Sequence, residues 1–367
     1  MSVDTKREEV LRELGTVQDP DLHRDLVSLG MIQDLKIEGD RVDFAVVLTT
    51  PACPVKDSMK QWSEDAVRRL PWVKQVSIDM RAQTTSGRTG AGEQLIPRVK
   101  NAIAVASGKG GVGKSTTSVN VALALAESGA KVGLMDADIY GPNVPLMMGI
   151  KNKPQLYSEG GKIVPARSYG IKLISIGFFT DDDNPVIWRG PMVHGAIQQF
   201  LRDIDWGELD YLVIDLPPGT GDAPLSLSQL IPLSGVVIVT TPQDVALQDV
   251  GKGMAMFQRL EVPVIGVIEN MSYFVCSNCD ARHEIFGNGG GERIARHFGV
   301  PFLGKVPLQQ KVREGGDEGR PVVITDPTSI ESEAFRAVAG AIAQQVSILA
   351  YASQGAFIPA ATLTLKK

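Results

Sequence analysis

The chain has 367 residues, of which 43% are hydrophobic and 22% are charged, and its formal net charge is -5; this length and composition predict an ordinary globular protein with room for two domains. The mild acidity argues against nucleic acid or an anionic membrane as a partner. The sequence contains no uninterrupted run of about 18 apolar residues, which is the length that a membrane span needs. The charged N-terminus lacks the apolar core of a secretory signal, so we expect a cytoplasmic protein with no nucleic-acid and no membrane partner.

The first predicted domain, residues 1–82, is a small α+β unit. Apolar spacing and turn residues predict a helix, a pair of strands, a second helix and a third strand. In chain order these elements are Lys6–Leu14, Met31–Glu38, Arg41–Thr49, Cys53–Leu70 and Val73–Met80. Gly39-Asp40 is expected to form the hairpin turn between the paired strands. Residues 83–98 are small, polar and glycine-rich, and they are predicted to be a flexible linker.

Short apolar, β-branched runs alternate with helical patterns in the second predicted domain, residues 99–350. The predicted strands are Ala102–Ala106, Lys131–Met135, Leu173–Ile176, Tyr211–Ile214, Val236–Thr240, Val264–Ile268 and Phe302–Val306. Such strands, alternating with helices, are typical of an α/β fold whose mostly parallel sheet is covered by helices on both faces. Residues 351–367 are predicted to be a C-terminal tail.

A glycine-rich loop joins the first of these strands to a helix. Gly108–Ser115 reads Gly-Lys-Gly-Gly-Val-Gly-Lys-Ser, which matches the Walker A pattern in the strand–loop–helix context that the pattern requires. The glycines let backbone N–H groups surround phosphates. Lys114 is expected to neutralise the β- and γ-phosphates, and Ser115 to hold Mg²⁺ with its hydroxyl. The sequence therefore predicts a P-loop NTPase that binds and hydrolyses ATP.

Polar residues at strand ends complete the predicted nucleotide site. Asp215 ends an apolar strand and fits a Walker B position, where it reaches Mg²⁺ through water. The loop Pro217–Asp222 follows and is expected to behave as a switch segment beside the γ-phosphate. The residues predicted to bind the nucleotide are Gly108, Lys109, Gly110, Gly111, Val112, Gly113, Lys114, Ser115, Thr116, Asp215 and Asn270.

Lys109, a second lysine within the loop, resembles the signature lysine of the deviant Walker A ATPases, the group of MinD, ParA and nitrogenase reductase. This resemblance implies that Lys109 reaches the nucleotide of a partner chain across a dimer, much as an arginine finger does. It also implies that Asp138 orients the attacking water and that Asn270 contacts adenine. We therefore expect Lys109, Lys114 and Asp138 to be catalytic. The alternatives are a solvated surface lysine, strand-end caps for Asp138 and Asp215, and a loop cap for Asn270.

The pair Cys276-Ser-Asn-Cys279 is expected in a loop after Asn270. Its spacing is compatible with a redox dithiol, half of a zinc site or half of an iron–sulfur site. Only Cys53 and four histidines remain in the chain, so one chain does not supply four thiolates from one loop. Two copies meeting at a two-fold axis would do so, and four sulfurs suit either a [4Fe–4S] cluster or a tetrahedral zinc.

Several stretches together resemble the Mrp/ApbC-type iron–sulfur cluster carrier ATPases. They are Ser107–Ser115, Asp136–Pro145, Trp188–Met192, Asp215–Asp222, Thr241–Leu247, Glu269–Ser272 and Cys276–Cys279. In the first domain, Asp19–Met31 and Thr49–Pro54 resemble the small domain of SufT/PaaD-like assembly factors. The resemblance thus covers both predicted domains.

This resemblance implies a homodimer that hydrolyses ATP slowly, holds a cluster at its interface, and passes the cluster from donors to apo acceptor proteins. The expected cofactors are ATP, Mg²⁺ and an iron–sulfur cluster, a [4Fe–4S] cluster bridging two chains, with Cys276, Cys279 and Ser115 as metal ligands. Two other classes remain open. A MinD/ParA-like positioning switch ATPase with a structural zinc at its dimer interface needs a basic DNA-binding face or an amphipathic membrane-binding tail, whereas Gly355–Lys367 carries only two lysines and no helical stripe. An electron-transfer reductase of the nitrogenase-iron-protein type has its cysteines spaced far apart.

Cys53 lies in the sequence Thr-Pro-Ala-Cys-Pro, which is compatible with a helix N-terminus. That position would lower the pKa of the thiol and allow a role in receiving or holding a cluster. A buried structural cysteine is the alternative.

Overall fold

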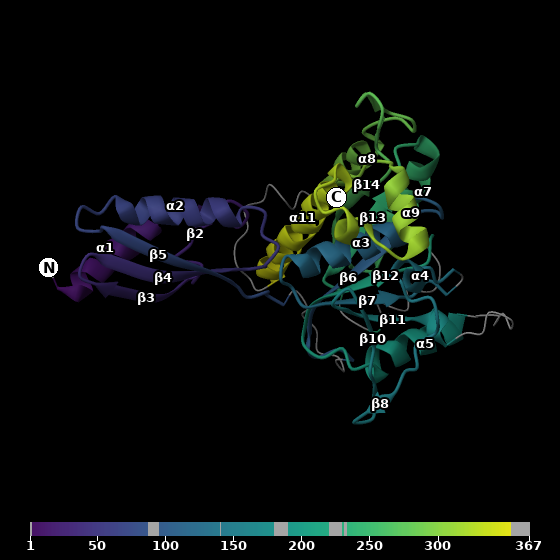
Figure 1. Cartoon of the computed structure of the whole chain (residues 1–367), viewed down its shortest axis with the longest axis horizontal. Helices are drawn as coiled ribbons and strands as arrows, with labels where there is room; N and C mark the ends of the chain where they lie inside the picture. Colours follow the sequence, from purple (N-terminus) through teal and green to yellow (C-terminus); the bar gives the residue numbers. More distant parts are fainter. Residues whose placement is uncertain are drawn as a thin grey trace. The chain divides into compact units, whose positions relative to one another are not determined.

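The computed structural model of the chain describes residues 2–86, 95–139, 141–179, 190–219, 230 and 233–353. The chain divides into two compact units, one of residues 1–85 with 347–367 and the other of residues 86–346 (Figure 1). Parts of the sequence-based predictions fall outside the described residues. These parts are the linker at 87–94, the motif positions 140 and 188–189, the switch segment at 220–222, and the tail from 354 onwards.

The N-terminal unit is an α+β fold built on a three-stranded sheet. Its elements are α1 (Val3–Leu14), β1 (Gln18–Asp19), β2 (Arg24–Asp25), β3 (Ile32–Glu38), β4 (Arg41–Leu48), α2 (Lys56–Arg68) and β5 (Gln75–Ala82). The central strand β4 pairs antiparallel with β3 and parallel with β5. Apolar side chains of both helices, such as Leu14 and Met59, pack with Val42 and Phe44 of β4 in one core. The predicted small α+β unit is confirmed.

The second predicted helix starts later than expected, at Lys56 rather than at Cys53. The physical reason is Pro54, because the residue before a proline is disfavoured in helical backbone. Cys53 therefore lies in the turn that precedes α2, where its carbonyl accepts a hydrogen bond of 3.3 Å from the Lys56 N–H.

An eight-stranded sheet organises the second unit. Its strands are β6 (Val99–Ser107), β7 (Val132–Asp136), β10 (Ala166–Ser168), β11 (Ile171–Ser175), β12 (Leu209–Asp215), β13 (Gly235–Thr240), β14 (Val264–Glu269) and β17 (Phe302–Lys305). The spatial order is β10-β11-β7-β12-β6-β13-β14-β17. Within this sheet the β10–β11 pair is antiparallel and the other pairs are parallel. The predicted mostly parallel sheet is confirmed; β10 was missed because three residues show no periodicity.

Helices cover both faces of this sheet. The helices described after β6 are α3 (Lys114–Glu127), α4 (Val144–Met147), α5 (Gly190–Asp203), α7 (Asp244–Arg259), α8 (Gly290–Phe298), α9 (Gln310–Glu318), α10 (Val322–Thr325) and α11 (Ile330–Ser353). Helix α3 packs on β6, β7 and β12. Ala102 and Ala104 of β6 share a core with Leu201 of α5, Met254 of α7 and Ala295 of α8. Alternate side chains of a strand face opposite sides, so β6 is buried from both. Within the described residues, no helix is long and apolar enough to cross a bilayer.

Candidate functional site

The phosphate loop runs from the end of β6 to the start of α3. Gly111 and Gly113 have φ angles of 82° and 81°, a left-handed conformation that residues with a side chain rarely adopt. A Cβ on Gly108 would lie 2.6 Å from backbone atoms of Asp249 and Val250 in α7, so this glycine allows the helix to approach the loop. The loop thus has the compact backbone, close to a helix N-terminus, that phosphate binding requires.

Lys114 lies buried between two carboxylates at the start of α3. Its Nζ is 2.8 Å from Asp215 Oδ2 and 3.6 Å from Asp138 Oδ2. Ser115 Oγ donates a hydrogen bond of 2.6 Å to Asp215 Oδ2, and Ser118 Oγ donates one of 2.6 Å to Asp215 Oδ1. The structure therefore brings the predicted residues Lys114, Ser115, Asp138 and Asp215 together, and it adds Ser118, which was not predicted. A hydroxyl and carboxylates beside a phosphate loop are oxygen ligands of the kind that Mg²⁺ prefers.

Strand pairing explains why residues so far apart in sequence meet here. In the parallel pair of β7 and β12, Asp136 lies directly opposite Asp215. Strand β12 pairs with β6 on its other side, where Asp215 lies opposite Val105. The carboxyl ends of parallel strands share one edge of the sheet, and in open α/β sheets ligands bind at that edge. This edge of the sheet therefore brings together Asp215 at the end of β12, Asp138 after β7 and the phosphate loop after β6.

Asp136 lies beside Asp215 and Asp138 and was not among the predicted site residues. It is fully buried, its Oδ2 accepts a hydrogen bond of 2.9 Å from Ser175 Oγ, and its Oδ1 accepts one of 3.1 Å from the Asp138 N–H. Burial, followed by the nearby charge of Asp215, raises the pKa of Asp136 to about 8. The available signal was an acid as the last residue of an apolar strand, the same signal that identified Asp215.

Lys109 and Thr116 also belong to the predicted nucleotide set. Lys109 is half-buried, and Ser107 Oγ donates a hydrogen bond of 3.0 Å to its carbonyl oxygen. Thr116 lies in the first turn of α3, and its carbonyl oxygen accepts a bond of 2.8 Å from Asn120 Nδ2. The predicted role of Lys109 concerns the nucleotide of a second chain, so it stays a prediction.

Asn270 follows β14 and touches the phosphate loop. Its Nδ2 donates a hydrogen bond of 2.8 Å to the Val112 carbonyl, and its backbone N–H donates one of 2.8 Å to the Thr240 carbonyl. A Cβ on Gly113 would lie 2.2 Å from Asn270 Nδ2, so glycine is needed for this contact as well as for the backbone angle. This contact with the loop was not anticipated, and the adenine contact of Asn270 stays a prediction.

The cysteine pair lies on a small hairpin formed by β15 (Phe274–Val275) and β16 (Arg282–His283). The Cys276 N–H donates to the Ala281 carbonyl at 3.0 Å, and the Asp280 N–H donates to the Cys276 carbonyl at 2.9 Å. Cys276 is half-buried and Cys279 is exposed. Hydrogen bonds from the Asn278 N–H and from Cys279 lower the pKa of Cys276, which favours the thiolate that metals bind.

The hairpin offers two thiols but no complete metal site. Among the described residues of one chain, no three or more His, Cys, Asp or Glu side chains are grouped to hold a metal ion. His283, the nearest histidine in sequence, packs its ring 6.4 Å from that of Phe274 instead. A cluster or zinc bound here therefore requires ligands from outside these residues.

Cys53 lies in the turn before α2, and its side chain is half-buried. It packs against the core of the N-terminal unit, and burial raises its pKa to about 11. The expected lowering of its pKa by a helix N-terminus is wrong, because the loss of solvation outweighs the backbone hydrogen bond that favours the thiolate.

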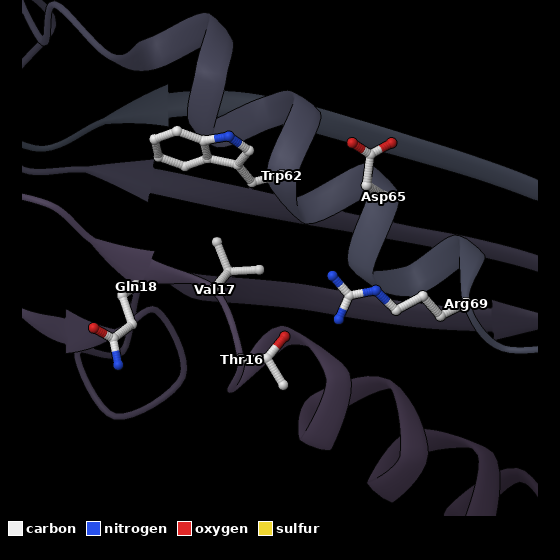
Figure 2. Close-up of a pocket in the computed structure, with 6 residues that line it drawn as sticks. All are labelled: Thr16, Val17, Gln18, Trp62, Asp65 and Arg69. Carbon is white, nitrogen blue, oxygen red and sulfur yellow. The ribbon is translucent and has the colours of Figure 1, made fainter.

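Figure 2 shows a separate pocket in the N-terminal unit. Its volume is about 300 Å³, and it lies between the segment after α1 and one side of α2. The lining residues are Thr16, Val17, Gln18, Trp62, Asp65 and Arg69. None of the predicted site residues is among them.

Comparisons with known proteins agree with this arrangement of two units. A family model described as NUBPL iron-transfer P-loop NTPase matches residues 98–343, and one described as iron-sulfur cluster assembly protein matches residues 7–79. The iron-sulfur cluster carrier protein of Synechocystis sp. is 50% identical over 349 residues, which cover 93% of this chain and 98% of that relative. The iron-sulfur cluster carrier protein of Escherichia coli (strain K12) is 41% identical over 345 residues, which cover 94% of each chain.

A solved structure is similar to a large part of the chain. It is the nucleotide-binding protein from Archaeoglobus fulgidus in complex with ADP, which is 38% identical and superposes with a TM-score of 0.57. The match covers 65% of this chain and 93% of that one. The phosphate loop, the converging strand-end acids and these matches together show that the chain belongs to the NUBPL iron-transfer P-loop NTPase family, with an N-terminal domain of the iron–sulfur cluster assembly type.

Proposed function

We propose that this protein is an ATP-dependent iron–sulfur cluster carrier that holds a cluster between two copies of the chain and transfers it to apo-proteins. The observation that carries the proposal is the presence, in one unit, of a phosphate loop and of a two-thiol hairpin that follows β14, the strand whose next residue, Asn270, bonds to that loop. The names of the relatives support the same function. The expected partners are a second copy of the chain, cluster donors and apo acceptor proteins, and the expected compartment is the cytoplasm.

The residues around the phosphate loop have the chemistry of phosphoryl transfer. Lys114 would neutralise the β- and γ-phosphates, and Ser115 with Asp215 would hold Mg²⁺, which supplies further positive charge to the phosphates. Asp138 lies next to Lys114 and would orient the water that attacks the γ-phosphorus, releasing phosphate and ADP. Lys109 of a partner chain would stabilise the charge that develops in the transition state. Turnover is expected to be slow.

The cluster is the cargo of the proposed carrier. Cys276 and Cys279 supply two thiolates per chain, so a two-fold dimer supplies the four that a [4Fe–4S] cluster takes. A site divided between two chains opens when the chains separate. ATP would influence release if it binds the closed and open dimers with different affinities.

Anaerobic reconstitution with iron and sulfide tests this function. We expect the wild type to take up about four irons per two chains, with the visible absorbance of a cluster and the mass of a dimer. The Cys276→Ala/Cys279→Ala variant should take up none. Cys53→Ala is the matched control, because it removes a thiol outside the hairpin, and it should bind as the wild type does. If the wild type binds only zinc, the chain is better explained as a switch ATPase of the MinD/ParA kind with a structural metal.

A further inference from the structure

The last residue of β14 and the residue that follows it face two different parts of the molecule. Successive side chains of a strand point to opposite sides. Asn270 bonds to the Val112 carbonyl in the phosphate loop at 2.8 Å. The preceding residue, Glu269, is fully buried and is directed to the segment that bears the cysteines.

The Glu269 carboxylate accepts hydrogen bonds through both oxygens. Oε1 accepts from Ser272 Oγ at 2.6 Å and from the Gly289 N–H at 3.3 Å, and Oε2 accepts from the Gly291 N–H at 2.6 Å. A buried carboxylate requires such partners, because its loss of hydration is otherwise unfavourable. A Cβ on Gly291 would lie 2.9 Å from Glu269 Cβ, so the approach also depends on a glycine in the first turn of α8.

Two of these donors flank the cysteine segment, residues 273–288. Ser272 immediately precedes the segment and Gly289 immediately follows it. The carboxylate of Glu269 thus joins the two ends of the segment that carries Cys276 and Cys279.

The first arm of the segment is also attached to the chain after β17. The Leu308 N–H donates to the Tyr273 carbonyl at 2.7 Å, and Gln309 Nε2 donates to the Val275 carbonyl at 3.0 Å. On the returning arm, an exposed bond of 2.9 Å joins Lys305 Nζ to Asn288 Oδ1. The bonds that the Gly289 and Gly291 N–H groups donate to Glu269 form a more buried attachment of the returning arm, where the low dielectric makes a charged hydrogen bond strong.

We propose that Glu269 is a positioning residue that couples the phosphate loop to the cysteine hairpin. A shift of the Val112 carbonyl on nucleotide binding moves Asn270, and the adjoining Glu269 transmits that movement to both ends of the cysteine segment. This contiguous set of hydrogen bonds gives the two sites a physical connection. The coupling itself is independent of the proposed function. Its consequence, that the nucleotide controls the release of a cluster, rests on the proposed function.

The test measures the cysteines without a cluster, on the iron-free full-length protein. Alkylation of Cys276 and Cys279 by iodoacetamide is followed by peptide mass spectrometry with and without MgATP. We expect MgATP to change the alkylation rate in the wild type. In Ser272→Ala and Glu269→Gln this nucleotide dependence should fall about tenfold, the effect of weakening one hydrogen bond to a charged group. Ser272→Ala should keep its ATP hydrolysis rate within about twofold, as expected for a residue that acts on the cysteines alone.

Ser332→Ala is the matched control. Ser332 is also fully buried, and its hydroxyl donates to the Val322 and Asp326 carbonyls at 3.0 and 2.7 Å. The control should keep the wild-type response. The proposal is overturned if the wild type shows no nucleotide dependence, if both Glu269→Gln and Ser272→Ala retain it, or if Ser332→Ala loses it equally.

A second readout separates this inference from the proposed function. Reconstituted Ser272→Ala should hold as much iron as the wild type, but MgATP should no longer accelerate or retard cluster transfer to an apo-ferredoxin. A wild type that binds no iron would contradict the carrier function and leave the alkylation result standing. If iron uptake is normal and both variants keep the wild-type dependence of alkylation on MgATP, the role of Glu269 is contradicted and the carrier function is not.

Discussion

Lys114 shows how the nucleotide site is organised at the scale of single residues. It is a buried cation that faces Asp215 and Asp138, and Asp215 is in turn bonded to the hydroxyls of Ser115 and Ser118. A bound phosphate would compete with these acids for the lysine. This group of side chains is therefore suited to exchange its bonds with one another for bonds to a nucleotide and its metal.

Substitutions of Lys114 and Asp138 should affect different steps, which are nucleotide binding and hydrolysis. Lys114→Ala should abolish ATP binding and hydrolysis, because the phosphates lose their cation. Asp138→Ala should retain binding but slow hydrolysis by about 100-fold or more, the usual contribution of a group that handles the attacking nucleophile. Binding of a fluorescent nucleotide and phosphate release measure the two steps. Glu208→Ala, at an exposed acid, is the control, and an unchanged rate in Asp138→Ala would remove its catalytic assignment.

The pKa of Asp136 has a consequence for stability. It rises from 3.8 to about 8 on folding, so the folded state binds a proton that the unfolded state releases. The stability contributed by the protonated carboxyl is complete below pH 3.8 and is lost as the pH rises towards about 8. Asp136→Asn should therefore gain stability relative to the wild type across this window. Thermal unfolding at several pH values measures the difference, and a pH-independent difference would show that Asp136 is already charged.

The three cysteines should differ in reactivity. Hydrogen bonds lower the pKa of Cys276, whereas burial raises that of Cys53 to about 11, and the thiolate is the nucleophile. Near neutral pH, iodoacetamide should therefore modify Cys276 before Cys53. Peptide mass spectrometry gives both rates in one sample. Cys53→Ala should leave ATP hydrolysis intact, and faster modification of Cys53 than of Cys276 would contradict these assignments.

At the scale of elements, the packing of the phosphate loop depends on the close approach of α7 to Gly108. Gly108 lies where a Cβ would meet the backbone of Asp249 and Val250 at 2.6 Å, whereas a Cβ on Gly110 would meet nothing within 4 Å. Gly108→Ala should lower the free energy of unfolding by about 1–3 kcal/mol, because backbone must move. Gly110→Ala is the matched control and should change it little. Urea unfolding without nucleotide measures both, and equal effects would show that α7 does not constrain the loop.

At the scale of the whole molecule, the proposed nucleotide chemistry belongs to one of two units. Every predicted nucleotide residue lies within residues 86–346. MgATP should therefore slow amide hydrogen exchange in the phosphate loop, around Asp136–Asp138 and in residues 269–289, and leave the β3–β5 sheet unchanged. Exchange measured by mass spectrometry tests this expectation, with Lys114→Ala as the control that shows no protection. Protection of the β3–β5 sheet in the wild type would show that the first unit also responds to the nucleotide.

The sequence alone determined the fold class and predicted the residues of the phosphate loop and the strand-end acid Asp215. Apolar strands alternating with helices predict a parallel sheet, because burial on both faces leaves a pattern in composition. The phosphate loop is recognisable because its glycines, lysine and serine act within a few consecutive residues, where backbone conformation is a local property. Asp215 was identified by its position at the end of such a strand.

The tertiary structure decided which distant groups meet and how their environments change them. Burial within the sheet raised the pKa of Asp136, and the pairing of β7 with β12 added to this by placing Asp136 opposite the charge of Asp215. Packing against the core reversed the expected pKa shift of Cys53. The contacts of Glu269 with Ser272, Gly289 and Gly291 depend on how β14, α8 and the cysteine segment pack. Burial and hydrogen bonding between separate elements depend on strand order and helix packing, which no local stretch of sequence specifies.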